Sequence, residues 1–312
     1  MSLFRKKRTE EKALSLSALT WKRFKKEKLG MLSLVFICLV VLMAILGNRI
    51  TPDKTRYCND QHLEIALQRP GFTVEERTNE WANNYSPQRK TYWLGTDNFG
   101  RDVLSRLMLG TRISLAVGFI AVFIALLIGV VVGATAGFYG GKIDAALTWL
   151  INVVWSIPTL LLVIAISFAL GKGFWQIFIA IGLTMWVDIA RVVRGQTLAL
   201  KQQDFVEAGR ALGFSNFRII FKHILPNIMG TLVVLSAANF SSAILMEAGL
   251  SFLGMGVQPP IPSWGMMMKE NYAYIVLDKA YLAIAPGIAI MLLVLAFMLI
   301  GSALRNAMEV KR

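Results

Sequence analysis

Long uncharged runs alternate with charged segments along the chain, and this pattern predicts several membrane-spanning helices. At 1.5 Å per residue, about 20 apolar residues cross the hydrocarbon core of a bilayer. The six candidate spans are residues 29–47, 113–141, 145–171, 173–187, 223–246 and 280–304, the fourth of which continues through a more polar end. Residues 248–268 are also uncharged, but their prolines and glycines disfavour a continuous helix. We interpret them as a loop, and a re-entrant course remains open.

The composition supports an all-α membrane protein with about six transmembrane helices. Hydrophobic residues make up 55% of the 312 residues and charged residues only 17%, whereas soluble domains are about 25% charged. This balance excludes a soluble enzyme, and the high apolar fraction excludes a disordered chain. The first run could be a signal peptide, but its 19 residues exceed a cleavable hydrophobic region of about 7–15 residues and favour an uncleaved anchor.

The net charge of +14 is explained by membrane orientation. With the N-terminus in the cytoplasm, three segments face inward. Residues 1–28 hold ten Lys+Arg and three acids, residues 191–223 hold six and two, and residues 305–312 hold three and one. Basic residues are retained on the cytoplasmic side, so binding of nucleic acid need not be invoked. The predicted organisation is a basic tail (1–28), an anchor (29–47), an outer loop with an amphipathic helix (48–112), a five-helix core (113–305) with an inner loop at 200–223, and a second tail (306–312).

The sequence contains no recognisable phosphate-binding loop, metal-binding motif or catalytic motif. Neither Gly-Lys pair belongs to a phosphate-binding loop, no HExxH motif occurs, and the two histidines fall on opposite sides of the membrane in this topology. No catalytic residue, metal site or bound cofactor is therefore expected.

The inner loop predicts a helix, a turn and a second helix that enters the membrane. Asp204 is a suitable N-cap, Gly213 suits the position after the helix, and Ser215 can cap the second helix. A small face would approach another protein closely, with charged contacts at its rim. The small residues are Ala208, Gly209 and Ala211, and the charged residues are Glu207 and Arg210. An ordinary surface hairpin remains the alternative.

This segment resembles the EAA motif of bacterial ABC import permeases. The matching residues, at the motif's spacing, are Glu207, Ala208, Gly213, Leu225 and Pro226. Two positions depart from it: Gly209 replaces an alanine and His223 replaces an isoleucine. The segments 94–107 and 250–265 narrow the resemblance to the dipeptide/oligopeptide/nickel branch, and within it to the permease that pairs with a second, different permease. The likeness covers about residues 20–310, apart from the polar stretch 52–90.

The resemblance implies a type I ABC importer permease in a bacterial inner membrane, with a cytoplasmic N-terminus. The implied partners are a second homologous permease, two ATPases that use ATP and magnesium, an extracytoplasmic binding protein and the bilayer. The implied ATPase-docking helix comprises Asp204, Glu207, Ala208, Gly209, Arg210, Ala211, Gly213 and Phe214, and the loop ends at His223, Leu225 and Pro226. The substrate would be a peptide, with nickel or another small solute as the alternative.

Isolated features inside the predicted spans suggest further roles. Gly129, Gly133 and Gly137 recur every four residues, a spacing that favours close packing against a neighbouring helix or against the partner permease. Glu247 is a candidate for the substrate pathway, or it lies at the membrane interface. Asp188 and Arg191 share a helix face and are expected to form an ion pair.

Two functions of other classes remain to be weighed. A secondary transporter would carry internal repeats and intramembrane ionisable groups, but no convincing repeat is found. A membrane-anchored scaffold would carry a folded soluble domain, whereas no soluble stretch exceeds the outer loop of about 65 residues.

Overall fold

The computed structural model describes residues 16–76, 88–171 and 175–308. Most of the basic N-terminal tail, part of the stretch 52–90, the start of the fourth predicted span and the end of the C-terminal tail lie outside the described residues. The longer helices are α1 (Leu16–Phe24), α2 (Lys28–Leu46), α3 (Val103–Tyr139), α4 (Gly141–Ser156), α5 (Thr159–Ala169), α6 (Gln176–Lys201), α7 (Asp204–Ala211), α9 (Leu225–Phe252), α10 (Trp264–Asn271) and α11 (Tyr281–Met308). The shorter elements are η1 (Gly47–Arg49), η2 (Leu63–Ile65), β1 (Phe72–Glu76), β2 (Gln88–Tyr92), α8 (Asn216–Ile219), η3 (Ile220–Ile224) and η4 (Tyr272–Ile275).

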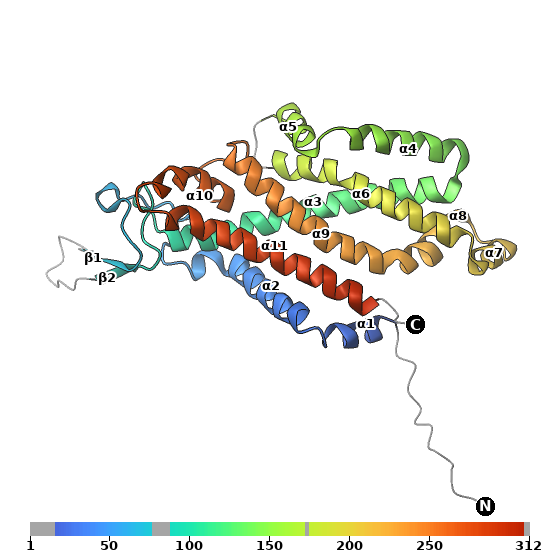
Figure 1. Ribbon diagram of the computed structural model, residues 1–312, viewed down its shortest axis with the longest axis horizontal. Helices are drawn as coiled ribbons and strands as arrows, with labels where there is room; N and C mark the ends of the chain where they lie inside the picture. Colours follow the sequence, from blue (N-terminus) through green and yellow to red (C-terminus); the bar gives the residue numbers. More distant parts are fainter. Residues whose placement is uncertain (1–15, 77–87, 172–174, 309–312) are drawn as a thin grey trace, which may run out of the picture.

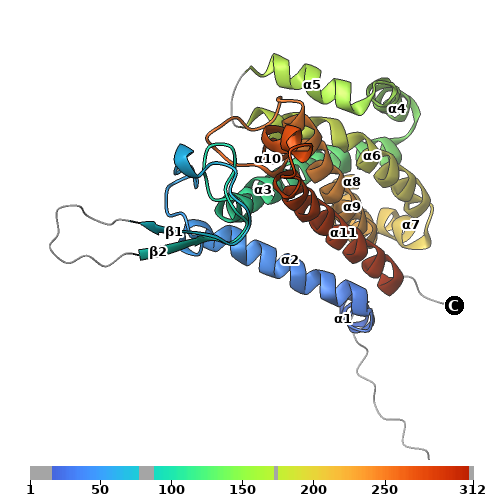
Figure 2. The same cartoon turned by 60° about the vertical axis from the view of Figure 1, so that its left-hand side comes forward.

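The long helices form an elongated bundle whose two ends differ (Figure 1). Helix α7 projects from one end, where α1 and the last turns of α11 also lie, and α10 and the β1–β2 pair occupy the other. We call these the α7 end and the α10 end. Figure 2 shows α2 along one side of the bundle and α4 and α5 along the opposite side.

The predicted spans are largely confirmed. Within the described residues, five helices are long and apolar enough to cross a membrane: Lys28–Arg49, Val103–Tyr139, Gln176–Lys201, Asn216–Phe252 and Tyr281–Met308. Helices α4 and α5 form a sixth span only if the pair is counted as one, because they meet at 95°. The prediction of one continuous helix over 145–171 is therefore wrong. Pro158 lacks an N–H group and forces the preceding Ile157 into an extended conformation, at ψ 129°.

The second predicted span begins earlier than expected. Asp102 caps α3, and its carboxylate accepts a hydrogen bond from the Ser105 N–H group at 3.1 Å. The helix after this cap continues directly into the span, so among the described residues of 48–112 the expected separate amphipathic helix does not form. At 1.5 Å per residue the 37 residues of α3 extend roughly 55 Å, well beyond a hydrocarbon core of about 30 Å.

Two other segments refine the expected all-helical fold. Strands β1 and β2 pair antiparallel, with Phe72 opposite Tyr92, and β2 runs past the end of the polar stretch 52–90. The segment 248–268 is only partly loop, because α9 continues to Phe252 and α10 begins at Trp264. Ser263 caps α10 by accepting a hydrogen bond from the Met266 N–H group at 3.2 Å.

The glycine repeat lies where α3 packs against α6. A β-carbon on Gly129 would approach Ile189, one on Gly133 would lie 2.4 Å from the carbonyl oxygen of Ala190, and one on Gly137 would meet Arg194 and Thr197. The absence of side chains lets the two helices approach closely. The prediction of packing against a neighbouring helix is confirmed, and that neighbour is α6 of the same chain.

Candidate functional site

The α7 hairpin begins at α7 and turns back through α8 toward the bundle. Gly213 has a φ of +74°, and its N–H group bonds to the carbonyl of Arg210 while the Phe214 N–H group bonds to that of Gly209. This pair of hydrogen bonds is the Schellman arrangement, which glycine accommodates without steric cost. Ser215 then caps α8, accepting from the Arg218 N–H group at 3.3 Å. The expected positions of Gly213 and Ser215 are confirmed.

The start of α7 differs from the prediction by one residue. Gln203 occupies the N-cap position without a side-chain capping bond, and Asp204 is the first helical residue. The Asp204 carboxylate therefore lies in the first turn, where the helix dipole favours a negative charge.

One face of α7 is open and the other packs within the hairpin. Val206 and Gly209 are buried, and a β-carbon on Gly209 would lie 3.4 Å from the Phe214 ring. Gly209 therefore packs against the hairpin's own aromatic residue, which corrects its expected place on the exposed small face. The exposed residues are Asp204, Phe205, Glu207, Ala208, Arg210, Ala211 and Leu212.

Phe214 joins the hairpin to the start of the next span. The Arg218 guanidinium lies 3.9 Å from the centroid of its ring. The His223 ring stacks on it at 5.6 Å between centroids. His223, one of the two departures from the motif, thus has a packing role. Leu225 is half-buried and Pro226 is exposed in the first turn of α9.

The hairpin also contacts α3. The guanidinium of Arg210 lies 5.7 Å from the ring of Phe138, and the Lys201 ammonium lies 5.8 Å from the same ring. Phe138 is 3% exposed. Displacement of α7 would therefore also move the adjacent ends of α3, α6 and α9.

Glu247 is fully buried between α9 and the segment that precedes α10. It accepts a hydrogen bond from the Ser251 hydroxyl at 2.6 Å, and its exposed fraction is 0%. Neither expectation for it, an aqueous pathway or the membrane interface, describes this enclosed position.

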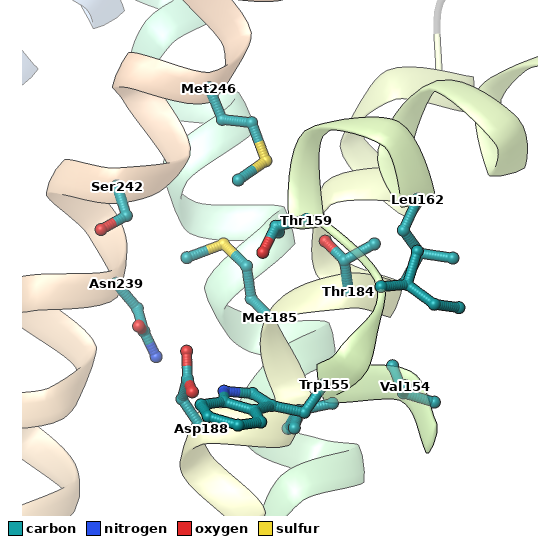
Figure 3. A pocket seen from close by; sticks show the side chains of 12 residues that line it. Val154, Trp155, Thr159, Leu162, Thr184, Met185, Asp188, Asn239, Ser242 and Met246 are labelled. Atoms are coloured by element: carbon teal, nitrogen blue, oxygen red, sulfur yellow. The ribbon is translucent and has the colours of Figure 1, made fainter. Parts of the chain in front are cut away.

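The break between α4 and α5 borders a pocket that the sequence did not indicate. The pocket has a volume of about 250 Å³ and lies between this break, α6 and α9 (Figure 3). Asp188 lines it, and the Asp188–Arg191 ion pair predicted from the sequence is not formed. Arg191 instead donates to Asn152 at 3.2 Å and stacks on Trp155 at 3.9 Å. The sequence feature that could have indicated this pocket is Pro158, because it breaks the third predicted span.

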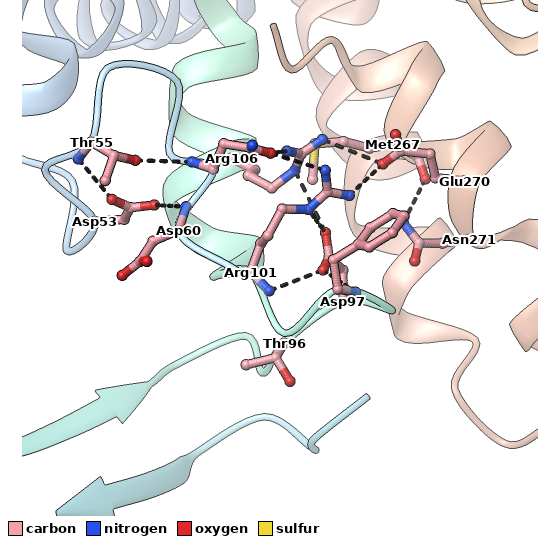
Figure 4. A network of polar contacts seen from close by, with 12 residues as sticks. Asp53, Thr55, Asp60, Thr96, Asp97, Arg101, Arg106, Met267, Glu270 and Asn271 are labelled. Carbon is pink, nitrogen blue, oxygen red and sulfur yellow. Dashed lines mark hydrogen bonds and ion pairs between the residues drawn. The ribbon is translucent and has the colours of Figure 1, made fainter. Parts of the chain in front are cut away.

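Buried charges hold together the α10 end (Figure 4). Arg101 pairs with Asp97 at 2.6 Å and with Glu270 at 2.7 Å, and Arg106 lies 3.3 Å from Glu270. The side chains of Arg101, Arg106 and Asp97 are at most 3% exposed. Trp264 also donates to the Leu107 carbonyl at 2.8 Å. The segments 94–107 and 250–265 therefore meet in space.

Burial also shapes the chemistry of two groups at this end. Burial raises the pKa of the Cys58 thiol to about 11. The Asp102 carboxyl also has a raised pKa because of burial, which its bonds to Ser105 partly offset. Across the described ranges, no three His, Cys, Asp or Glu side chains are grouped as a metal site.

Comparisons with known proteins show the family to which the chain belongs. Residues 129–310 match the family described as binding-protein-dependent transport system inner membrane component, and residues 15–70 match the N-terminal TM domain of oligopeptide transport permease C. The chain is 36% identical over 301 residues to the oligopeptide transport system permease protein OppC of Bacillus subtilis (strain 168), covering 96% of this chain and 92% of the relative. It is 37% identical over 292 residues to the glutathione transport system permease protein GsiD of Escherichia coli O157:H7, covering 93% and 89%.

The fold is similar to that of a solved ABC transporter. An inward-facing structure of the MetNI methionine ABC transporter aligns with a TM-score of 0.54 at 21% identity, over 66% of this chain and 98% of that chain. This likeness concerns the fold alone. On the family match and the two relatives, the chain belongs to the binding-protein-dependent transport system inner membrane components, the permease subunits of ABC importers, which are transport subunits rather than enzymes.

Proposed function

We propose that the chain forms half of the translocation pathway of an ATP-driven importer of di- and oligopeptides. A second homologous permease forms the other half, two ATPases that use ATP and magnesium dock on the α7 hairpin, and a substrate-binding protein docks on the α10 end. The chain lies in the bacterial inner membrane with its N-terminus and the α7 end in the cytoplasm. The two relatives named above support the substrate class, since oligopeptides and glutathione are both peptides.

The observation that carries the proposal is the open face of α7. Glu207 and Ala208 are exposed there, and within the described chain Glu207 has no ion-pair partner. The orientation is supported by the sequence, because the predicted cytoplasmic segments carry most of the excess of Lys and Arg. A charged rim around small residues suits close approach by a second protein.

The hairpin's inner face supplies the mechanical link. Val206 and Ile219 are fully buried, and Phe214 packs against Arg218 and His223. Close packing makes such a unit move as a body rather than deform. Closure of the ATPases would thus displace α7 together with the start of α9, and the long helices would carry this motion toward the α10 end.

Charge reversal tests the docking role. Glu207→Arg should abolish co-purification of the ATPases or uncouple ATP hydrolysis from peptide uptake. Glu64→Arg, a reversal at an exposed glutamate on the α10 end, serves as the control and should retain the ATPases. Normal assembly together with normal uptake in Glu207→Arg would refute the docking assignment.

The substrate requires a separate experiment. Cells that lack this chain should lose uptake of labelled di- and oligopeptides and regain it on complementation. Loss of nickel uptake with normal peptide uptake would instead support the alternative solute. Uptake independent of the ATPases would indicate a secondary transporter.

A further inference from the structure

The pocket beside the α4–α5 break contains a carboxylate without a partner. Asp188 is the thirteenth of the 26 residues of α6 and is exposed. Its expected partner Arg191 is engaged with Asn152 and Trp155 instead. Within the described residues, no ion pair or hydrogen bond satisfies the Asp188 carboxylate. An ionisable side chain halfway along a spanning helix is costly unless it meets a counter-charge or lines a water-filled path.

A second polar group on the facing helix also lacks a partner. The Nδ2 atom of Asn239, on α9, is buried and makes no hydrogen bond. Figure 3 shows the Asn239 amide and the Asp188 carboxylate pointing toward one another across the pocket. A buried amide nitrogen without an acceptor costs about 1–3 kcal/mol. The two groups therefore offer one strong acceptor and one donor to a molecule that enters.

The remaining walls combine flexible apolar side chains with the hydroxyl groups of Thr159, Thr184 and Ser242. Met185 and Met246 face the pocket from α6 and α9, and Trp155 closes one side (Figure 3). Methionine side chains adjust to differently shaped neighbours because they are unbranched and polarizable. Such walls tolerate varied side chains, while the polar pair binds groups common to all cargo molecules.

The size of the pocket indicates that it is part of a larger site. Its volume of about 250 Å³ lies below the range of about 300–1,000 Å³ that is usual for ligand sites. In the proposed assembly, a second permease would complete the enclosure. The pocket then forms one wall of the pathway near the middle of the bundle.

We propose that this pocket is a binding subsite of the translocation pathway, in which Asp188 binds the protonated amino group of a passing peptide and Asn239 donates to a peptide carbonyl or carboxylate. This inference rests on the proposed function, since it assumes a peptide cargo. The ammonium group supplies the counter-charge that Asp188 lacks, and the cargo oxygen supplies the acceptor that Asn239 lacks. Binding is confined to the peptide backbone and termini, so the site accepts different sequences.

The test uses the complete complex with its binding protein in proteoliposomes, and measures ATP-driven transport of labelled tri-alanine per complex. Asp188→Asn should lower the rate by between about tenfold and a hundredfold, the factor that corresponds to one charge-assisted hydrogen bond. Asp188→Glu should retain most of the rate. The exchange variant, Asp188→Asn with Asn239→Asp, moves the carboxylate across the same pocket and should restore transport. Glu27→Gln makes the same carboxylate-to-amide change at the junction of α1 and α2, outside the pocket, the α7 hairpin and the α10 end, and is the matched control.

The outcomes separate this inference from the proposed function. If the unaltered complex does not transport tri-alanine but imports another solute, the proposed function fails. If it transports the peptide and Asp188→Asn does so equally well, the subsite is refuted while the function stands. Loss that neither Asp188→Glu nor the exchange variant restores also refutes the subsite, because it indicates a role in folding. If Asp188→Asn does not assemble, the exchange variant decides: transport supports the subsite, and its absence refutes it.

Discussion

The two ends of the bundle differ in the burial and ion pairing of the charged residues compared below. At the α10 end, Arg101 and Arg106 are buried and pair with acids of the same chain. At the α7 end, Asp204 and Glu207 are exposed and, within the described residues, make no ion pair. The first arrangement holds distant segments together, whereas the second leaves charges available to another protein.

This difference assigns stability and interaction to different ends. Removing one partner of a buried ion pair leaves an uncompensated charge, which costs far more than loss of an exposed pair. The α10 end should thus be sensitive to substitution in the isolated chain. The α7 end should be tolerant in the isolated chain and sensitive only in the assembled transporter.

The largest effect is expected from Arg101→Ala. Among the ion pairs of Asp97 and Glu270 in the described chain, it leaves the longer contacts to Arg106. It should lower the free energy of unfolding by about 3–5 kcal/mol, measured by denaturation in detergent. The control, Arg69→Ala, removes an exposed pair 3.9 Å from Asp278 and should change stability little. Equal losses in the two variants would contradict the contrast between the ends.

An intermediate effect is expected where α3 and α6 connect the two ends. A β-carbon at Gly133 meets the backbone of Ala190 at 2.4 Å, so Gly133→Ala should destabilise the isolated chain by about 1–3 kcal/mol. Gly195 on α6 has no atom within 4 Å of such a β-carbon. Gly195→Ala should therefore be neutral or stabilising, and equal unfolding midpoints for the two variants would argue against tight packing at Gly133.

Substitution on the α7 hairpin should leave the isolated chain almost unchanged. Leu212 is 72% exposed at the turn, so Leu212→Ser should alter the free energy of unfolding by no more than about 0.5 kcal/mol. The same variant should reduce the amount of ATPase that co-purifies. Leu63→Ser, at a residue that is 71% exposed on the α10 end, should retain the ATPases, and a comparable loss in both would indicate a general defect.

The smallest effect concerns thiol labelling at the α10 end. Cys58 is 0% exposed, and burial raises its pKa to about 11. Only about a thousandth of the thiol is ionised at pH 8, so maleimide should label Cys58 slowly in the folded chain and quickly after denaturation. The thiolate fraction rises with pH toward 11, so labelling should accelerate there. Rapid labelling at pH 8 would show that the α10 end is open.

The sequence predicts those parts of the fold that depend on local patterns. Apolar run length located α2, α9 and α11, and capping residues located the hairpin at Gly213 and Ser215. The bend at Pro158 was missed because hydropathy alone does not register a lost backbone donor. Asp97 and Glu270 share Arg101 although they are far apart in sequence, so only tertiary structure brings them together. The inward position of Gly209 likewise depends on the fold of Phe214 back onto α7.

Protection of α7 by the ATPases tests the central claim most directly. A single reactive cysteine is introduced by Ala208→Cys in a chain that carries Cys38→Ala and retains the buried Cys58, and maleimide labelling is compared with and without the ATPases. Val276→Cys, at a residue that is 89% exposed on the α10 end, provides the control. The account predicts that the ATPases slow labelling at position 208 and leave it unchanged at position 276. Equal labelling of position 208 in the assembled and ATPase-free complexes would contradict the docking of the ATPases on this hairpin.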